Sequence, residues 1–465
     1  MLSSLNTGLS GLQAQRRQLD LIGHNISNAA TPGYHRQRAE LQGVGAPSNG
    51  LFSGAGVRPY GVEVIGISRS FDALLAARAV REQGSSAFAE LSSQTLSRLE
   101  GLFPEPSDVG LANQLQEFWA GWTDVANDPG SLASRTALLE RASSLISTLQ
   151  TTAADIASVK ASAVGRLSTL ASEANGLATE IGTLNAQIAA TPSAAHDLLD
   201  HRDLLVTRLA ELTGAQPRDA ERGQIDVYIG GRAIVTGAVA HEIYADEGVP
   251  ATGVPPSLKW KVGGQAVAAS SGEAASLFIT INDIVPRYTN ALDAVAAKLV
   301  TDVNDRHFVG FGMDGAVTNK NFFVPADPGP PAVPVTAATI RLSADVAGLP
   351  QNIAAAAVGG APLDGEHARG IAALIDSTGG ADVDYRALIA GLAVETRGAI
   401  RRADNQAQVT DTAISDAESV GSVSIDEEMA NLVGSQRAYE ASARFLTVVD
   451  ELLGTLIQRT GVVGR

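Results

Sequence analysis

The longest regular pattern in the chain lies between Pro129 and Pro192, where no proline interrupts the sequence. Apolar residues recur there at spacings of three and four, and Lys160 is the single exception on the stripe. Because this spacing puts its members on one face of a helix, it predicts one helix of about 60 residues that packs like a coiled coil. The apolar members are Leu149, Ala153, Ile156, Ala163, Leu167, Leu170, Ala174, Leu177, Ile181, Leu184 and Ile188. Shorter helical patterns occur at 71–101, 108–127 and 195–213.

The N-terminal segment shows the same spacing on a shorter scale. Arg16 and Gly23 interrupt its stripe, which otherwise predicts an amphipathic helix with a narrow apolar seam. The helix should end at Thr31-Pro32-Gly33, because proline disfavours helical geometry in the preceding residue and glycine permits a turn. The apolar positions of the stripe are Leu2, Leu5, Leu9, Leu12, Leu19 and Ile26.

The C-terminal segment carries signals for both ends of a helix. Ser424 and Glu427 have the spacing of a capping box, and the acidic run 426–428 lies where a helix dipole favours negative charge. Gly461 follows Arg459 and predicts the end of this helix. Apolar residues recur every seven positions between these signals, at Ile425, Leu432, Tyr439, Leu446 and Leu453.

The two ends of the chain have opposite charge. Residues 1–45 contain four arginines and two acidic residues, whereas residues 411–465 contain nine acidic residues and four arginines. This favours pairing of the two terminal helices, although single surface ion pairs contribute little. Two interpretations stay open: the helices close one core within the monomer, or their seams pack against other copies of the chain.

Between the ends, the pattern changes twice. Residues 34–70 are rich in glycine and read as extended or loop-like, and residues 216–281 contain two alternating runs, each followed by a pair of glycines. Alternation before Gly-Gly is typical of hairpins, so we predict a small antiparallel β unit over 216–281. Helical spacing returns at 288–303 and, after a Gly/Pro-rich stretch, at 364–376 and 382–417.

These patterns predict a mainly α protein with an inserted β domain. The N- and C-terminal helices pair as a coiled coil, and a long-helix bundle and a small antiparallel β domain complete the chain. The predicted domains are a terminal helical domain of residues 1–70 and 411–465, a bundle of residues 71–215 and 282–410, and the β domain of residues 216–281.

Composition excludes several classes of function. The chain has 465 residues and a formal net charge of −16, so a general affinity for nucleic acid or anionic lipid is not expected. It contains no cysteine, which removes disulfides, thiolate nucleophiles and cysteine-type metal sites. No apolar run is long enough to insert across a membrane, and the first thirty residues lack the pattern of a secretory signal.

Sequence motifs of catalytic, cofactor-binding or metal-binding sites are largely missing. The sequence GFGMDG at 310–315 resembles a dinucleotide-binding pattern, but it lacks a βαβ context and is interpreted as a turn. His196, Asp200 and His201 share a predicted helix, and we interpret them as a solvated surface rather than a metal site. The sequence has no phosphate-binding loop, zinc-protease motif or nucleophile elbow. We therefore predict that the chain is not an enzyme, with no catalytic residue, cofactor or metal.

The sequence NISNAATPGYHRQ at 25–37 resembles the N-terminal signature of the bacterial flagellar axial family of rod, hook and hook-associated proteins. SVSIDEEMANLVGSQRAYEASARF at 422–445 and DELLGTLI at 450–457 are similar to the C-terminal block of the same family. The residues after the turn and at the start of the last helix look more like hook-associated members than hook or rod subunits. The motif residues are Asn25, Asn28, Thr31, Pro32, Gly33, Tyr34, Arg36, Gln37, Asp426, Glu427, Glu428, Asn431, Gln436 and Tyr439.

The resemblance implies a structural adaptor that joins the flagellar hook to the filament. It implies export by the flagellar type III apparatus from the cytoplasm, and location at the hook–filament junction outside the cell. The implied partners are copies of the chain in a ring, the hook protein, the next hook-associated protein toward the filament, and an export chaperone on the C-terminal helix. A hook or distal-rod subunit is the nearest alternative, and an extracellular enzyme or ligand-binding module carried by the β domain is a more distant one.

On this hypothesis the terminal helices are disordered until neighbours cover their seams, and they fold on assembly. We expect the inner packing layer to comprise Leu5, Leu9, Leu12, Leu19, Ile26, Leu432, Tyr439, Leu446 and Leu453.

Overall fold

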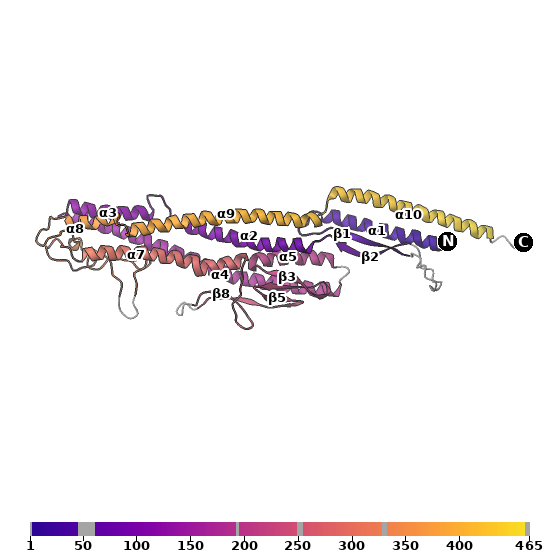
Figure 1. Ribbon diagram of the computed structural model, residues 1–465, viewed down its shortest axis with the longest axis horizontal. Helices are drawn as coiled ribbons and strands as arrows, with labels where there is room; N and C mark the ends of the chain where they lie inside the picture. The colour runs from indigo at the N-terminus through magenta and orange to yellow at the C-terminus, as the bar shows by residue number, and fades with distance from the viewer. Residues whose placement is uncertain (1, 45–60, 192–194, 249–253, 328–332, 461–465) are drawn as a thin grey trace.

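The protein is elongated, with its long helices running along one axis and both termini at the same end (Figure 1). The computed structural model describes residues 2–44, 61–191, 195–248, 254–327 and 333–460. The helices are α1 (Leu2–Asn28), α2 (Ala73–Glu100), α3 (Leu111–Asn127), α4 (Leu132–Ala190), α5 (His196–Thr213), α6 (Gly272–Ile279), α7 (Val285–His307), α8 (Glu366–Ala372), α9 (Ala381–Gly421) and α10 (Ile425–Thr460). The strands are β1 (Gln37–Val44), β2 (Gly61–Arg69), β3 (Gln216–Asp219), β4 (Ile225–Ile229), β5 (Arg232–Thr236), β6 (Val239–Ala240), β7 (Ile243–Asp246) and β8 (Ser257–Trp260). Among these described segments, none of the helices is long and apolar enough to cross a membrane.

Helix α4 has 59 residues and confirms the long helix predicted from the apolar stripe. Ser131 caps its start, where the Ser131 side chain accepts a hydrogen bond from the backbone N–H of Ser134 at 3.2 Å. Helices α3, α5 and α7 pack against α4. The other predicted helical segments correspond to α2, α3, α5, α7, α8 and α9 within a few residues.

The core follows α4 along the rod in two main clusters. At the end away from the termini, aromatic rings pack closely, with centroid distances of 4.9 Å for Phe322 and Phe323 and 5.2 Å for Trp122 and Phe322. Nearer the termini, Leu167 and Ile181 of α4 pack with residues of the β strands. One helix therefore supports both the distal core and the β unit.

The β unit is antiparallel, as predicted, but smaller than expected. Strands β3 to β6 form one sheet in chain order, and β7 pairs with β8. Gly230 and Gly231 have φ angles of 54° and 88°, the left-handed geometry that a tight hairpin between β4 and β5 needs.

Residues 272–284 correct the predicted extent of the β structure. They form α6 and a π-helical turn (Thr280–Ile284), and they pack against α2 and α5. A short apolar run such as this one reads equally well as a strand or as a buried helix, because periodicity does not separate the two. The second predicted hairpin is present in a short form, since the chain turns at Gly263 and Gly264 after β8, and Lys259 and Ala266 form an antiparallel bridge.

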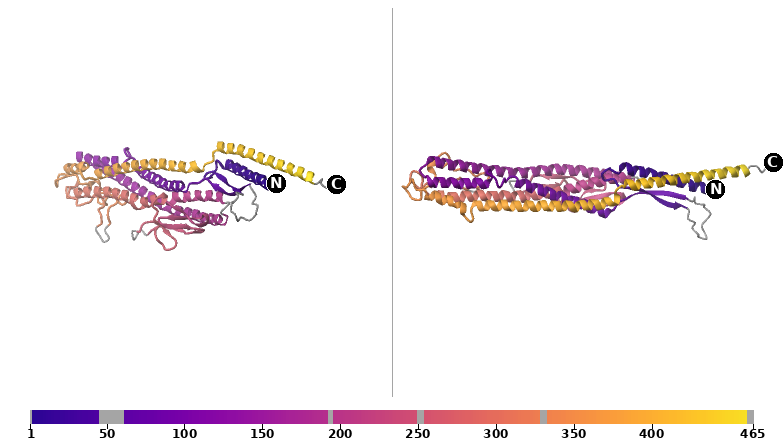
Figure 2. Two further views of the ribbon diagram at one scale, coloured as in Figure 1. Left: turned by 45° about the vertical axis from the view of Figure 1, so that its right-hand side comes forward. Right: turned by 90° about the horizontal axis from the view of Figure 1, so that it is seen from above.

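Beyond the bundle, α1 and α10 lie side by side, and the β1–β2 hairpin covers another face of α1 (Figures 1 and 2). The hairpin occupies most of the described part of the segment 34–70 that was predicted as extended; residues 45–60 of this segment lie outside the described residues. The predicted end of the last helix at Gly461 also lies outside the described residues. We call α1, β1, β2 and α10 the arm; its two long helices pair within one chain.

Candidate functional site

The two terminal motifs meet at the base of the arm around the side chain of Asn25, which is 1% exposed. The Asn25 amide nitrogen donates to the carbonyl of Gln37 at 3.0 Å and to Glu428 Oε2 at 3.1 Å. The Asn25 amide oxygen accepts from the hydroxyl of Tyr34 at 2.8 Å and from the backbone N–H of Gln37 at 3.0 Å. The Asn25 side chain donates two hydrogen bonds and accepts two, and only an amide supplies this combination.

The turn after α1 directs Tyr34 back toward Asn25. Gly33 has a φ of 73°, and a Cβ at this position would lie 2.7 Å from the Leu204 side chain, so glycine is required on both grounds. Asn28 donates to the carbonyl of His24 at 3.0 Å and accepts from Thr31 at 3.3 Å, which holds the helix end. Burial, together with the negative charges of Asp197, Asp200 and Glu428, raises the pKa of Tyr34, so the phenol stays protonated and can donate.

Arg36 joins the turn to the start of α10. Its guanidinium contacts Glu427 Oε1 at 2.9 Å and Glu428 Oε1 at 2.5 Å, and its backbone N–H donates to the carbonyl of Gly421 at 2.8 Å. Burial lowers the pKa of Arg36, but the hydrogen bonds and charges of Glu427 and Glu428 outweigh it and leave the pKa above its ordinary value. We call Asn25, Tyr34, Arg36, Gln37, Glu427 and Glu428 the clasp.

The acidic residues at the start of α10 therefore do more than the dipole role predicted for them. Ser424 accepts from the backbone N–H of Glu427 at 3.4 Å, in keeping with the predicted cap. Glu428, however, is almost completely buried and pairs with residues from the other end of the chain. A favourable helix dipole would not require such burial.

A second set of polar contacts joins the arm to α5. Asp200 Oδ1 lies 2.7 Å from His35 Nδ1 and 2.7 Å from Arg69 Nη1, and Asp200 Oδ2 accepts from the backbone N–H of His35 at 3.0 Å. Arg69 also donates to Asp203 at 2.8 Å. Gln37 donates to Asp197 at 2.9 Å, so three carboxylates of one helix face hold the arm.

A solvated surface was predicted for His196, Asp200 and His201, and this arrangement contradicts the prediction for Asp200; His196 is half-buried, with both ring nitrogens covered. Asp200 is 6% exposed, because the turn and β2 cover the first turns of α5. His201 is exposed and lies 3.6 Å from Glu180, in keeping with the prediction for that residue. Among the described residues, no group of three or more His, Asp or Glu side chains has the geometry of a metal site.

The structure brings some predicted motif residues into the clasp and leaves others outside it. Asp426, Asn431 and Gln436 are exposed, as are Thr31 and Pro32. The contacts with His35, Arg69 and the α5 carboxylates were missed. The spacing of Asp197, Asp200 and Asp203 at three-residue intervals was an available signal, because it places all three on one helix face.

The predicted packing layer is half-buried in the single chain. Leu5, Leu12, Leu19 and Ile26, with Leu432, Tyr439, Leu446 and Leu453, are neither buried nor exposed, and Leu9 is 48% exposed. The buried apolar residues of α1 are instead Ala14, Leu21 and Ile22. Gly8 allows the close approach of α10, because a Cβ there would lie 2.7 Å from Leu446.

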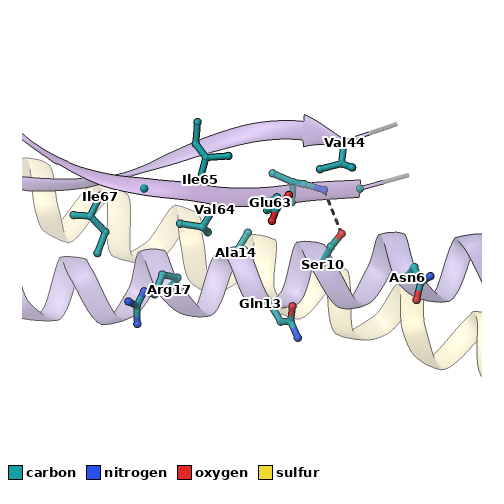
Figure 3. Close-up of a pocket in the computed structure, with 13 residues that line it drawn as sticks. Asn6, Ser10, Gln13, Ala14, Arg17, Val44, Glu63, Val64, Ile65 and Ile67 are labelled. Atoms are coloured by element: carbon teal, nitrogen blue, oxygen red, sulfur yellow. Dashed lines mark hydrogen bonds between the residues drawn. The ribbon is translucent and has the colours of Figure 1, made fainter. Parts of the chain in front are cut away.

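A groove of about 630 Å³ runs between α1 and β2 (Figure 3). Val64 and Ile67 point toward α1, and Ser10 accepts a hydrogen bond from the backbone N–H of Val62 at 3.2 Å. Ile65 points away from α1 and is largely exposed. Helix α10 also exposes apolar residues along its length, namely Met429, Val433, Phe445, Val448, Leu452, Leu456 and Ile457.

Comparison with known proteins accounts for both the bundle and the arm. A family model described as the helical domain of flagellar hook-associated protein FlgK matches residues 96–323. The models for the flagella basal body rod protein and for the C-terminal region of flagellar basal body rod FlgEFG protein match residues 5–35 and 422–459, which include Asn25, Tyr34, Glu427 and Glu428 of the clasp. Flagellar hook-associated protein 1 of Bacillus subtilis strain 168 is 26% identical over 99% of both chains. The chain belongs to the flagellar hook-associated protein 1 family.

Two further members agree with this assignment. Flagellar hook-associated protein 1 of Salmonella typhimurium strain LT2 is 25% identical over 70% of this chain and 59% of its own length. The solved structure of the flagellar hook junction protein FlgK from Burkholderia pseudomallei has the same fold, with a TM-score of 0.63 and 14% identity, over 75% of this chain and all of that one. Hook-associated protein 1 is a structural flagellar protein, and this chain is a structural component rather than an enzyme.

Proposed function

We propose that this chain is the adaptor at the junction between the flagellar hook and filament. Its partners would be the hook protein on one side and the next hook-associated protein toward the filament on the other. The observation that carries the proposal is the clasp, which joins the two terminal family motifs into one paired-helix arm. An arm whose helix α10 exposes several apolar side chains suits a subunit whose ends are covered by neighbours.

The proposed domain organisation follows the three predicted domains. Residues 1–70 and 411–465 would form the axial core, residues 71–215 and 282–410 the bundle outside it, and residues 216–281 an inserted β domain. The position of the arm beyond one end of the bundle supports this division. Within the β domain, α6 packs on the bundle helices α2 and α5, which would fix its position.

In the assembled flagellum, copies of the chain would form a ring through the terminal helices. The half-buried layer around Leu9 and Leu446 leaves apolar surface for a neighbouring copy, and the exposed face of α10 adds to it. Because such contacts join different surfaces of adjacent copies, they close into a ring or continue as a helical array.

Before assembly, the chain would be made in the cytoplasm and exported by the flagellar type III apparatus. The absence of cysteine suits passage of an unfolded chain, because no disulfide can restrain it. An export chaperone would bind the C-terminal helix from about residue 430, where apolar residues recur at spacings of three and four that a helix-binding groove recognises.

Deletion of the gene in a motile bacterium tests the proposal, with electron microscopy of the cell surface as the readout. We expect hooks of normal length that carry no filament, and full filaments after complementation with the intact chain. Loss of the hook itself would instead indicate a hook or distal-rod subunit. Normal filaments in the deletion strain would contradict a junction role.

A further inference from the structure

Helix α9 carries a cluster of arginines in its first half, near the end of the rod away from the termini (Figure 1). Residues 386–402 contain four arginines and one acidic residue, although the whole chain has a net charge of −16. The acidic residue, Glu395, is already paired with Arg287 of α7 at 2.9 Å. The charge of this part of α9 is therefore opposite in sign to the net charge of the chain.

Three of these arginines lie on the outer face of α9. Arg386, Arg397 and Arg401 are exposed, and the intervals of eleven and four residues between them are close to whole numbers of helical turns. None of the three forms an ion pair with another described residue, and Arg386 and Arg397 donate to carbonyls of their own helix. Val394 and Ile400, which are 67% and 41% exposed, lie between them. We call these five residues the basic stripe.

An excess of carboxylates lies on helices α3 and α4 at the same end of the bundle. Glu117, Asp124 and Asp128 follow one face of α3, and Glu140 lies on α4; all four are exposed. Arg141 contacts Asp124 at 2.8 Å and Glu117 at 3.6 Å, which still leaves negative charge in excess. We call the four acidic residues the acidic flank.

The stripe and the flank lie on different sides of the bundle. Trp119 marks the side of α3 that faces α9, because its indole N–H donates to Asp382 at 2.9 Å. At 3.6 residues per turn, Glu117 and Asp124 lie about 140–160° around α3 from Trp119, so they point away from α9. Helix α4, which carries Glu140, packs against α3 and α7, and its contact with α9 is slight. One copy can therefore meet two neighbours, one through each surface.

We infer that the basic stripe of one copy binds the acidic flank of the next copy in the assembly. The inference rests on the ring proposed above, and it adds a contact between bundles to the contacts of the terminal helices. Copies of a chain with a charge of −16 repel one another, and complementary patches offset that repulsion where the copies touch. Because the two patches differ, the contact is heterologous and repeats from copy to copy.

Small side chains on the flank leave room for the stripe. Ala120 of α3 is exposed, three residues after Glu117. Ala137 of α4 is exposed, three residues before Glu140. Arginine is enriched at protein interfaces, and its long side chain can reach the carboxylates across these alanines. The same approach would bury the two apolar residues of the stripe.

The two patches lie at different heights along the rod. Trp119, in the middle of the flank, is level with Asp382 at the start of α9. Arg397 follows Asp382 by fifteen residues in a helix that runs toward the arm (Figure 1). At 1.5 Å per residue, the stripe lies about 20 Å nearer the arm than the flank does. The contact would therefore displace each copy along the rod relative to its neighbour, as in one turn of a helical array.

Charge reversal tests the contact in the deletion strain complemented with the full chain. E117K/D124K and R397E/R401E each place like charges opposite one another, and we expect hooks that bear filaments to become about tenfold rarer in each strain. The quadruple variant restores opposite charges between neighbouring copies and should return filaments to most hooks. Electron microscopy counts the hooks with and without filaments.

The matched control is D155K/E180K, which changes the net charge as E117K/D124K does, at exposed positions of α4 outside the flank. It should leave filaments at the wild-type frequency. Circular dichroism of each purified variant establishes that the bundle is folded, and immunoblotting of the culture medium establishes that the chain is exported. Wild-type filament numbers in both double variants, or no recovery in the quadruple variant, would overturn the contact. Failure of the wild-type chain to restore filaments would instead contradict the junction role on which the contact rests.

Discussion

Replacement of Asn25 by alanine should uncouple the two ends of the chain while leaving the bundle intact. The N–H and C=O of Gln37 both lose their partner, since Asn25 binds them at 3.0 Å in a buried site. Each unsatisfied buried group costs about 1–3 kcal/mol, so the arm should lose ~4 kcal/mol of stability. Tyr34 keeps His24 as a partner, and Glu428 keeps Arg36, so these groups add little to the loss.

Amide hydrogen exchange followed by mass spectrometry measures this loss segment by segment. A decrease of ~4 kcal/mol corresponds to exchange roughly 10³-fold faster at the base of the arm, around residues 34–44 and 424–430, with no change in α4. The matched control is N28A, because Asn28 binds only within the helix end and its turn. If N25A accelerates exchange no more than N28A, the clasp does not hold the arm together and the reasoning is wrong.

Three further outcomes are expected from other parts of the molecule. L446D should abolish incorporation of the chain at the hook tip, while circular dichroism shows that the bundle stays folded. T447D, at the exposed neighbouring position, should still be incorporated. Normal incorporation of L446D would contradict the proposed packing layer. G8V should weaken the contact of α1 with α10 by about 2 kcal/mol, because the added side chain overpacks against Leu446. G23V should cost less than about 1 kcal/mol, because no atom lies within 4 Å of the added Cβ. Equal amide hydrogen exchange rates of α1 in the two variants would contradict this prediction. Burial lowers the pKa of His307 to about 4 and outweighs the hydrogen bond to the carbonyl of Lys320, which raises it; the ring also accepts a hydrogen bond from the backbone N–H of Ala354 inside the core. Below about pH 6.5 the unfolded chain therefore binds a proton at this histidine that the folded chain does not bind. The free energy of unfolding should be highest above that pH and fall by up to ~3 kcal/mol toward pH 4. Urea unfolding should show this decline in the wild type and less of it in H307Q, with H201Q as the control.

Most helices of this fold could be predicted from the spacing of apolar residues. The stripe of α4 and the seven-residue repeat of α10 extend over many turns, so their period indicates a helix whichever elements cover the stripe. The prediction was wrong for residues 272–284. There the apolar run is short, and its burial between α2 and α5, rather than its periodicity, selects a helix.

The site was predicted in part. The motif residues Asn25 and Glu428 were singled out by resemblance, but their hydrogen bond spans 403 positions in the sequence. Asp200 was assigned to a solvated surface, because an acidic residue on an amphipathic helix is usually exposed. Its burial depends on where the turn after α1 and the end of β2 come to lie, and neither position can be read from α5 itself.

The sequence by itself determined the extent of the long helices, the buried face of α4, the turn at Thr31-Pro32-Gly33 and the start of the last helix. These features follow from local sterics, capping and periodic burial, which act over a few residues. Only the tertiary structure decided that Asn25, Arg36 and Glu428 form one clasp and that Asp200 holds the arm to the bundle. Such contacts join segments far apart in the chain, so their partners are fixed by how the helices cross rather than by any local pattern.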